Sequence, residues 1–204
     1  MPAARTATKN GRKATVTRER ILDAAAKVLA ERGYAGTRLG EIADVAGIQP
    51  PAIYYHFESR EALMEEVIRL GTRKTREHVE RVLADLRPDL SALERLDAAL
   101  EAHLRCVLDL SDYAKAAIRN AGQVPADMRA RQFQDEKAYG AVWRKLFNDA
   151  ARSGEIPGTI DVRAARMLIV GALNNTPEWW DPSVTSLDKL IATTHAIVRS
   201  GLSA

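Results

Sequence analysis

The side chains best suited to acid–base, nucleophilic or metal chemistry are few in this sequence and lie far apart. The histidines are His56, His78, His103 and His195, and no two of them have the HExxH spacing of a zinc hydrolase. The sequence also lacks the GxSxG, GxGxxG and GxxxxGK[ST] patterns of other enzyme classes. Cys106, the single cysteine, lies among apolar residues of an expected helix, where a thiol is typically buried and inert. The sequence therefore predicts no enzyme, no cofactor and no metal site.

The basic residues are distributed unevenly along the chain. The 204 residues have a formal net charge of +3, but the first twenty contain six basic side chains and one acidic side chain. This segment therefore has a net charge of +5, whereas the remainder is slightly acidic. A basic arm attracts polyanions, of which nucleic acid is the first candidate, although a solubilising tail has the same composition.

Composition and hydropathy place the chain among ordinary globular proteins. Hydrophobic residues make up 46% and charged residues 28% of the sequence. The longest apolar stretch, over residues 167–173, is far shorter than the ~18 residues that a membrane span requires. No apolar segment follows the basic N-terminus as in a secretory signal, and one cysteine excludes an intrachain disulfide. We therefore expect a cytoplasmic protein without a membrane partner.

Apolar residues recur at helical spacing from Thr17 onwards. The pattern predicts a first helix from Thr17 to Gly33, a second that Thr37 caps and Gly47 ends, and a very short third over residues 50–55. Such an arrangement, with a tight glycine turn before the third helix, is a helix-turn-helix, whose third helix enters the major groove of DNA. The residues expected to hold this third helix inward are Ile48, Ile53 and Phe57.

Beyond Ser59 the sequence has the periodicity of further helices and no alternation typical of strands. The expected helices span residues 60–86, 91–110, 112–120, 126–153, 162–176 and 186–200. We therefore predict an all-α fold in three parts. These are a disordered basic arm (1–14), a helix-turn-helix DNA-binding domain (15–60) and a helical ligand-binding and dimerisation domain (61–204).

About a dozen positions in the first third of the chain resemble the TetR family of transcriptional regulators. They are found in Arg20-Ile21-Leu22-Asp23-Ala24-Ala25, Gly33-Tyr34, Gly36-Thr37, Ile42-Ala43, Ala46-Gly47-Ile48, Ile53-Tyr54, His56-Phe57 and Arg60-Glu61-Ala62-Leu63. The resemblance implies a repressor that binds a palindromic operator as a homodimer and is released by a small hydrophobic effector. Three positions depart from the family pattern, namely Gln49, Pro51 and Arg60, which affects base preference more than DNA binding itself.

The residues expected to contact DNA lie at helix starts and along the third helix. Gln49 suits a bidentate hydrogen bond to adenine, worth about 1–3 kcal/mol of discrimination, or it caps the helix instead. The resemblance implies phosphate contacts for Tyr54 and His56, although His56 could instead close the following turn. Thr37 and Arg60 begin helices, where the dipole favours a phosphate. The full set is Arg12, Lys13, Thr37, Arg38, Gln49, Pro50, Ala52, Tyr54, Tyr55, His56 and Arg60, with Arg12 and Lys13 expected to reach the minor groove.

One short recognition helix contacts few bases, so we expect two copies to bind a palindrome as a homodimer. The last two expected helices are the candidate dimer surface, because each has an apolar stripe and the resemblance implies a four-helix bundle between subunits. Alternatively, both stripes pack within one monomer. The stripes consist of Leu187, Leu190, Ile191, Thr194, Ile197 and Val198 on one helix, and Met167, Leu168, Gly171 and Ala172 on the other.

Aromatic residues gather in the C-terminal part. Tyr139, Trp143 and Phe147 share one helical face, which suits either a small-molecule pocket or a plain hydrophobic core. The segment from Gly171 to Pro182 resembles a helix end in the TetR branch that controls fatty-acid and steroid degradation, which implies an effector such as an acyl-coenzyme A thioester. The expected ligand residues are Tyr113, Arg119, Tyr139, Trp143, Asn174 and Trp179. Arg119 and Arg129 are candidates to contact the effector's phosphates, or they are solvated surface charges.

A second class of DNA-binding protein fits the same sequence features. A protein of chromosome organisation or division would need the helix-turn-helix but no small-molecule inducer. A hollow pocket behind the aromatic residues would favour effector sensing, and a solid core would favour this alternative. In the sensing protein, the helix over residues 60–86 connects the two units and is the expected lever between effector and DNA.

Overall fold

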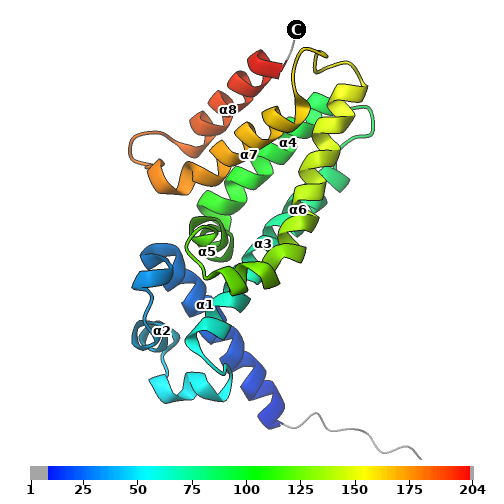
Figure 1. The fold of residues 1–204 in the computed structure, drawn as a ribbon. Helices are drawn as coiled ribbons and strands as arrows, with labels where there is room; N and C mark the ends of the chain where they lie inside the picture. Colours follow the sequence, from blue (N-terminus) through cyan, green and yellow to red (C-terminus); the bar gives the residue numbers. More distant parts are fainter. Residues whose placement is uncertain (1–8, 203–204) are drawn as a thin grey trace, which may run out of the picture.

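The computed structural model of the chain describes residues 9–202, except for the side chains of residues 9–13, 126, 127, 129 and 131–133. Every regular element in this range is a helix, which confirms the predicted all-α fold. The elements, in chain order, are α1 (Lys9–Gly36), α2 (Leu39–Ala46), the 3₁₀ helix η1 (Pro50–Tyr55), α3 (Arg60–Ala84), α4 (Ala92–Arg105), the π-helical turn η2 (Cys106–Leu110), α5 (Asp112–Asn120), α6 (Ala126–Arg152), α7 (Val162–Trp179) and α8 (Leu187–Leu202) (Figure 1).

The N-terminal helices pack as the apolar spacing predicts. Ile21, Leu29, Ile42 and Ile53, from α1, α2 and η1, are almost completely buried in one core. Gly33 takes the positive φ of 70° that ends the regular part of α1. The predicted connector after it, residues 34–36, is a last helical stretch beyond this kink.

The first helix begins earlier than predicted. It starts at Lys9 rather than at Thr17, so residues 9–14 of the arm predicted to be disordered are helical. No proline lies between Lys9 and Thr17, and lysine, arginine and alanine are good helix formers, which lets the helix continue through the expected cap. The remainder of the predicted arm, residues 1–8, lies outside the described residues.

Two further helix boundaries differ from the prediction. The long helix expected over residues 91–110 ends its α-helical part at Arg105 and continues as the π-helical turn η2. The helix expected to stop at residue 176 runs through Pro177 to Trp179. Pro177 has no N–H to donate to the carbonyl of Leu173, and the hydroxyl of Thr176 donates to that carbonyl instead, at 2.7 Å.

The short helix α5 lies between the DNA-binding helices and the rest of the molecule (Figure 1). Tyr113, Ala116 and Ala117 of α5 belong to the same hydrophobic core as α1 and the first half of α3. A second core joins the end of α3 to α4, α6, α7 and α8. The first core thus contains residues from both sides of residue 60, where the sequence predicts a domain boundary. The division into domains stays a prediction.

Close packing of α3 on α5 depends on Gly71. A Cβ atom at this position would lie 2.0 Å from the carbonyl oxygen of Tyr113 and 2.7 Å from the Cβ of Ala117. Real side chains do not approach a backbone oxygen so closely, so only glycine permits this crossing. The crossing places α5 beside both the DNA-binding helices and the cavity described below.

Candidate nucleic-acid interface and ligand cavity

The turn between α2 and η1 presents the short helix outward. Gly47 ends α2 in the left-handed conformation, with φ of 63°, as predicted. The guanidinium of Arg20, on α1, donates a hydrogen bond to the carbonyl of Ala46 and so satisfies a free C-terminal acceptor of α2. Pro50 and Pro51 occupy the first turn of η1, where no N–H is needed.

The outward side of η1 is aromatic and polar. Tyr55 is 89% exposed and Tyr54 is 59% exposed, whereas Ile53 and Phe57 are buried against α1 and α2. Gln49 is exposed and makes no side-chain capping bond, so the interpretation of Gln49 as a mere cap is wrong. Its amide is available to a base edge or a phosphate.

The neighbouring predicted contacts differ in exposure. Pro50 and Arg38 are exposed, and Ala52 and His56 are partly exposed. Arg38 stands immediately before α2 in extended conformation, next to the free N–H groups of that helix start. Together with Gln49, these residues surround η1 and remain candidates for the DNA surface.

Thr37 is buried and does not cap α2, in contrast to the prediction. Its side chain is only 2% exposed, and its hydroxyl donates to the carbonyl of Gly33 at 2.7 Å. Arg38, and not Thr37, occupies the N-cap position of α2. Thr37 therefore locks the kink at the end of α1, and we remove it from the candidate phosphate contacts.

Arg60 is also engaged inside the protein. Its Nε donates to the carbonyl of Thr37 at 3.0 Å, and its terminal nitrogens bond the carbonyl of Tyr34 and pair with Glu61 at 3.2 Å. The guanidinium stacks 4.8 Å from the centre of the Tyr34 ring. Arg60 thus fastens the start of α3 to the α1–α2 connection, and we remove it from the phosphate contacts as well.

Two basic residues of the first segment are structural. Arg18 pairs with Glu66 of α3 and stacks over Phe57, with 4.9 Å between the guanidinium carbon and the ring centre. Arg20 closes the end of α2, as described above. The side chains of Arg12 and Lys13, the predicted minor-groove contacts, lie outside the described residues.

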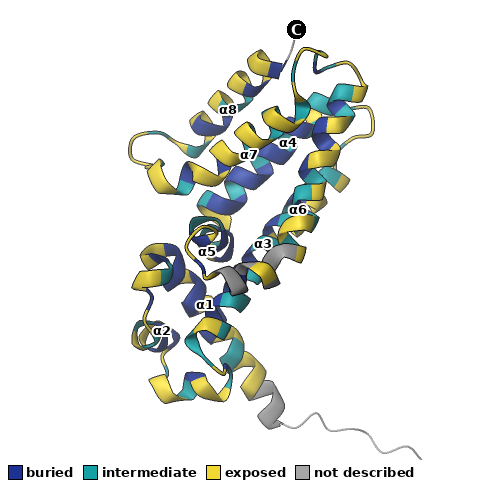
Figure 2. Ribbon diagram, in the orientation of Figure 1, coloured by how far each residue is buried: buried dark blue, intermediate teal, exposed yellow. Residues whose placement is uncertain are grey.

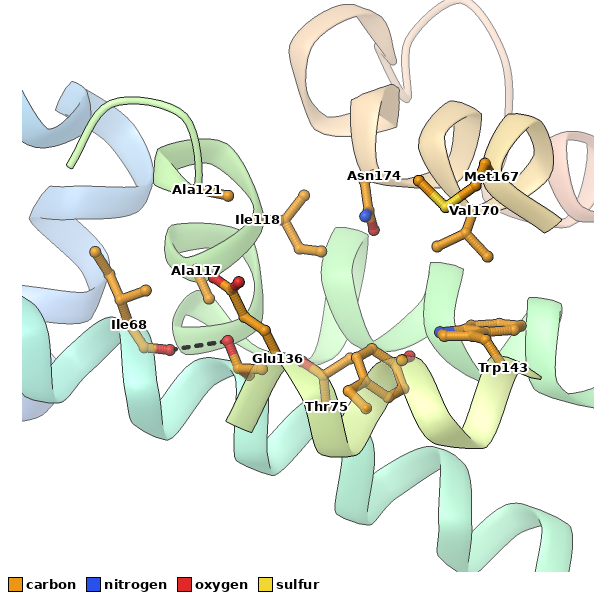
Figure 3. A pocket seen from close by; sticks show the side chains of 13 residues that line it. Ile68, Thr75, Ala117, Ile118, Ala121, Glu136, Trp143, Met167, Val170 and Asn174 are labelled. Atoms are coloured by element: carbon orange, nitrogen blue, oxygen red, sulfur yellow. Dashed lines mark hydrogen bonds between the residues drawn. The ribbon is translucent and has the colours of Figure 1, made fainter. Parts of the chain in front are cut away.

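A cavity of about 440 Å³ lies behind α5, between α3, α6 and α7 (Figure 3). A volume of this size suits a small hydrophobic ligand, and most of its walls are apolar. Three of the predicted ligand residues, Tyr139, Trp143 and Asn174, line it. Its other lining residues are Ile68, Thr72, Thr75, Ala117, Ile118, Ala121, Glu136, Gly140, Met167 and Val170.

A buried polar cluster adjoins this cavity. The imidazole of His103 is completely buried, and its Nδ1 lies 2.8 Å from the hydroxyl of Tyr139. The Trp143 ring meets the His103 ring edge-on at 5.8 Å. Burial lowers the pKa of His103 to about 4 and raises the pKa of Tyr139, so both groups are neutral at pH 7.

Three predicted ligand residues do not line the cavity. Tyr113 faces α1, where its hydroxyl donates to Asp23 at 2.8 Å. Arg119 donates to the carbonyl of Ala30 at 2.8 Å and pairs with a carboxylate on α7. The ring of Trp179 is 57% exposed outside the cavity, and the side chain of Arg129 lies outside the described residues.

Two features of the cavity were missed in the sequence. The sequence indicates His103 only as a possible metal or catalytic residue, and it does not indicate that Ala117 of α5 and Ala121, which follows α5, form walls of a cavity. Leucine-rich periodicity showed that α4 has a buried face, but it could not show that the histidine on that face meets an aromatic pair.

The outer faces of α7 and α8 combine buried and exposed apolar residues (Figure 2). Leu190, Ile191 and Val198 pack inside the monomer, so this part of the predicted dimer stripe has an internal role. Leu168 is 74% exposed and Ile197 is 67% exposed, on either side of a groove of about 380 Å³ between the two helices. Exposed apolar residues gathered along a groove are typical of a protein–protein interface.

In the part of the chain that the structure describes, no helix combines the length and the hydropathy needed to cross a membrane. Nor do three side chains of the His, Cys, Asp and Glu types come together within residues 9–202 as a metal site would require.

Comparison with known proteins agrees with this architecture. Residues 21–67 match the model of the bacterial regulatory proteins of the tetR family, and residues 89–201 match the tetracyclin repressor-like C-terminal domain. The HTH-type transcriptional repressor KstR2 of Rhodococcus jostii is 30% identical over 98% of this chain and 96% of that protein. The fatty acid metabolism regulator protein of Bacillus subtilis is 28% identical over 88% of this chain and 90% of that protein.

A solved structure of similar sequence has the same fold. The transcriptional regulator FadR from Bacillus subtilis, in complex with stearoyl-CoA, superposes with a TM-score of 0.71 at 26% identity, covering 90% of this chain and 98% of that one. The family matches extend over both halves of the molecule, and they coincide with the helix-turn-helix and with the helices around the cavity. The chain therefore belongs to the TetR family of bacterial regulatory proteins and is a DNA-binding transcriptional regulator.

Proposed function

We propose that this regulator is a homodimeric repressor that leaves a palindromic operator when a small hydrophobic effector, such as an acyl-CoA, enters the cavity. The observation that carries the proposal is the cavity of about 440 Å³ behind α5, the short helix that packs on α1. A solid core at this place would have favoured the chromosome-organising alternative. We further propose that the protein has no catalytic activity and acts in the cytoplasm, where bacterial DNA is accessible.

The DNA contact is proposed to centre on η1. Tyr54 and Tyr55 can donate to phosphates or pack on thymine methyls, and Gln49 can pair with adenine. Arg38, Pro50, Ala52 and His56 complete the surface, and Arg12 and Lys13 remain the candidates for the minor groove. Since Thr37 and Arg60 are occupied internally, they act by fixing the orientation of η1 and α3.

The dimer is proposed to form through α7 and α8. Leu168 and Ile197 are exposed beside an apolar groove, and burying them against a second copy would remove that surface from water. A twofold pair of η1 helices would then meet two half-sites of one operator.

An acyl-CoA is the effector class that the relatives favour. The related FadR from Bacillus subtilis was solved with stearoyl-CoA, and the fatty acid metabolism regulator protein of the same organism is similar in sequence to this chain. The cavity in this chain is mostly apolar, which suits an acyl group, while the coenzyme must stay in water because burying its phosphates would be costly.

Fluorescence anisotropy with a labelled fragment of the DNA upstream of the protein's own coding sequence tests the DNA-binding part. Tyr55→Ala is expected to weaken binding about tenfold, because an exposed contact of about 1.4 kcal/mol is lost without any effect on the core. Trp179→Ala is the matched control, since this residue is also an exposed aromatic but lies on α7. Equal affinities of the two variants would contradict the proposed surface.

Titration of the protein–DNA complex with acyl-CoA esters tests the effector part. Release of the DNA at micromolar ester supports the proposal, and DNA binding that no ester changes would refute an acyl-CoA effector. A protein truncated before Thr15 tests the arm, because each lost phosphate contact flattens the log–log salt slope by about 0.9. An unchanged slope would exclude Arg12 and Lys13 from the interface.

A further inference from the structure

The deep wall of the cavity holds a hydrogen-bond donor without a partner. Trp143 lines the cavity and is only 2% exposed, and its indole Nε1 has no hydrogen-bond partner. In Figure 3 the nitrogen edge of this ring faces the other lining residues, not the outside. A buried N–H left unpaired costs about 1–3 kcal/mol, so a group that accepts from it would be bound favourably.

The pair of His103 and Tyr139 supplies a second free donor. The neutral imidazole has one N–H and the phenol has one O–H, and the 2.8 Å bond between them uses only one of these two protons. If Tyr139 donates, the spare proton is on His103 Nε2, which has no partner but belongs to a residue behind the lining of the cavity. If His103 donates, the spare proton is on the hydroxyl of Tyr139, which lines the cavity.

Other polar groups near the cavity do not accept hydrogen bonds from these donors. Thr75 donates to the carbonyl of Gly71 at 2.8 Å, and Thr72 donates to the carbonyl of Ile68 at 3.3 Å. The Asn174 amide lies near His103, and the Trp143 indole lies near the Tyr139 hydroxyl. However, neither His103 Nε2 nor Trp143 Nε1 makes a hydrogen bond of ordinary geometry. The buried wall therefore offers the Trp143 indole, and the Tyr139 hydroxyl when His103 donates to it, in mostly apolar surroundings. The remaining polar lining residues, Glu136 and Asn174, are exposed.

We propose that the effector carries a carbonyl oxygen on its buried apolar part, which accepts hydrogen bonds from the Trp143 indole and from the Tyr139 hydroxyl, with His103 Nδ1 donating to that hydroxyl. The effector class is thus an oxo-substituted hydrophobic acid or its thioester, in place of a saturated hydrocarbon acid. This inference rests on the proposed effector cavity and specifies what the cavity selects.

The physical basis is the difference between the two ligands in the same cavity. A carbonyl oxygen has two lone pairs and can accept both protons, so neither donor stays unpaired when such a group is bound. A saturated group of the same size fills the cavity and leaves the donors without an acceptor. Sites built to bond a polar ligand atom discriminate strongly against the analogue that lacks it.

A matched pair of probes tests the inference directly. The coenzyme A thioesters of 4-oxocyclohexanecarboxylic acid and cyclohexanecarboxylic acid differ by one oxygen at the end remote from the thioester. Calorimetric titration of the full-length protein is expected to give a dissociation constant at least tenfold lower for the oxo compound. In Trp143→Phe this ratio should fall to about threefold or less, while Trp179→Phe should keep the wild-type ratio.

An isotope-edited infrared spectrum provides a second measurement that does not depend on a variant. The ¹³C-labelled oxo group, bound to the wild-type protein, is expected to absorb at lower frequency than in an apolar solvent because two donors polarise it. Equal dissociation constants of the two thioesters, or a ratio that Trp143→Phe leaves unchanged, would refute the inference. If neither thioester binds while the DNA fragment still does, the DNA-binding function stands and the carbonyl selection is refuted.

Discussion

Acidification from pH 7 to pH 5 is expected to destabilise the protein through the buried His103. Its pKa is lowered to about 4 by burial, against 6.5 for an ordinary histidine. Between these values the unfolded chain binds a proton that the folded chain excludes. By linkage, stability is then retained above pH 6.5 and lost as the pH falls towards 4.

The magnitude follows from the two pKa values. The full difference of about 2.5 units corresponds to about 3.4 kcal/mol, reached only below pH 4. At pH 5 the unfolded chain is almost fully protonated at this site and the folded chain is not, which leaves a loss of about 2 kcal/mol relative to pH 7. This is a sizeable part of the stability of an ordinary domain.

Urea denaturation at a series of pH values measures this effect. The wild-type free energy of unfolding should fall by about 2 kcal/mol more than that of His103→Gln between pH 7 and pH 5, because glutamine does not titrate. The comparison uses the slope with pH, so a lower absolute stability of the variant does not matter. His56→Gln, which removes the same ring from a partly exposed site, should keep the wild-type slope. Parallel curves for the wild type and His103→Gln would refute the reasoning.

Three other changes have defined outcomes. Gly71→Ala forces a methyl group against the carbonyl oxygen of Tyr113 and should cost about 2 kcal/mol in urea denaturation, whereas Gly40→Ala, which meets no atom within 4 Å, should stabilise by about 0.5–1 kcal/mol. Asn120→Ala leaves a backbone N–H of α1 without its 2.6 Å partner and should cost about 2 kcal/mol in the same assay; a change below 0.5 kcal/mol would contradict this. Leu168→Asp places a charge on the proposed dimer face and should convert dimer to monomer in sedimentation; an intact dimer would exclude this surface.

The sequence was sufficient to predict the helices because their signals are local. Gly47 ends α2 with a positive φ, and the hydroxyl of Ser59 accepts from the backbone of Ala62 at 3.0 Å, as a cap should. The errors at Lys9 and Pro177 have the same origin. At both positions the sequence allows a helix boundary, and interactions with neighbouring residues determine whether the helix ends there. Beside Pro177, for example, the Thr176 hydroxyl donates to the carbonyl of Leu173, and the helix continues.

The partners of individual side chains were less predictable. A position at a helix start is available to a phosphate only if nothing in the protein reaches it first, and the two carbonyls that bind Arg60 come from residues more than twenty positions away. Likewise, Tyr139 and Trp143 were recognised because they share a helical face, whereas Tyr113 and Arg119 lie on a helix whose neighbours no local pattern reveals. Periodicity shows that a residue is buried but not what buries it.

Arg119, a predicted ligand residue that does not line the cavity, and its neighbour Asn120 indicate how an effector could act on DNA. Arg119 and Asn120 bond backbone groups at the end of α1, while Ala117 and Ile118, on the same short helix, line the cavity. A ligand that displaces α5 therefore strains hydrogen bonds to α1 directly, without first moving the long helix α3. Because Gly71 holds α3 and α5 at van der Waals distance, the two helices must move together or separate at a cost. The lever expected from the sequence, α3 alone, is thus better described as the pair of α3 and α5, with α5 as the member that contacts both sites.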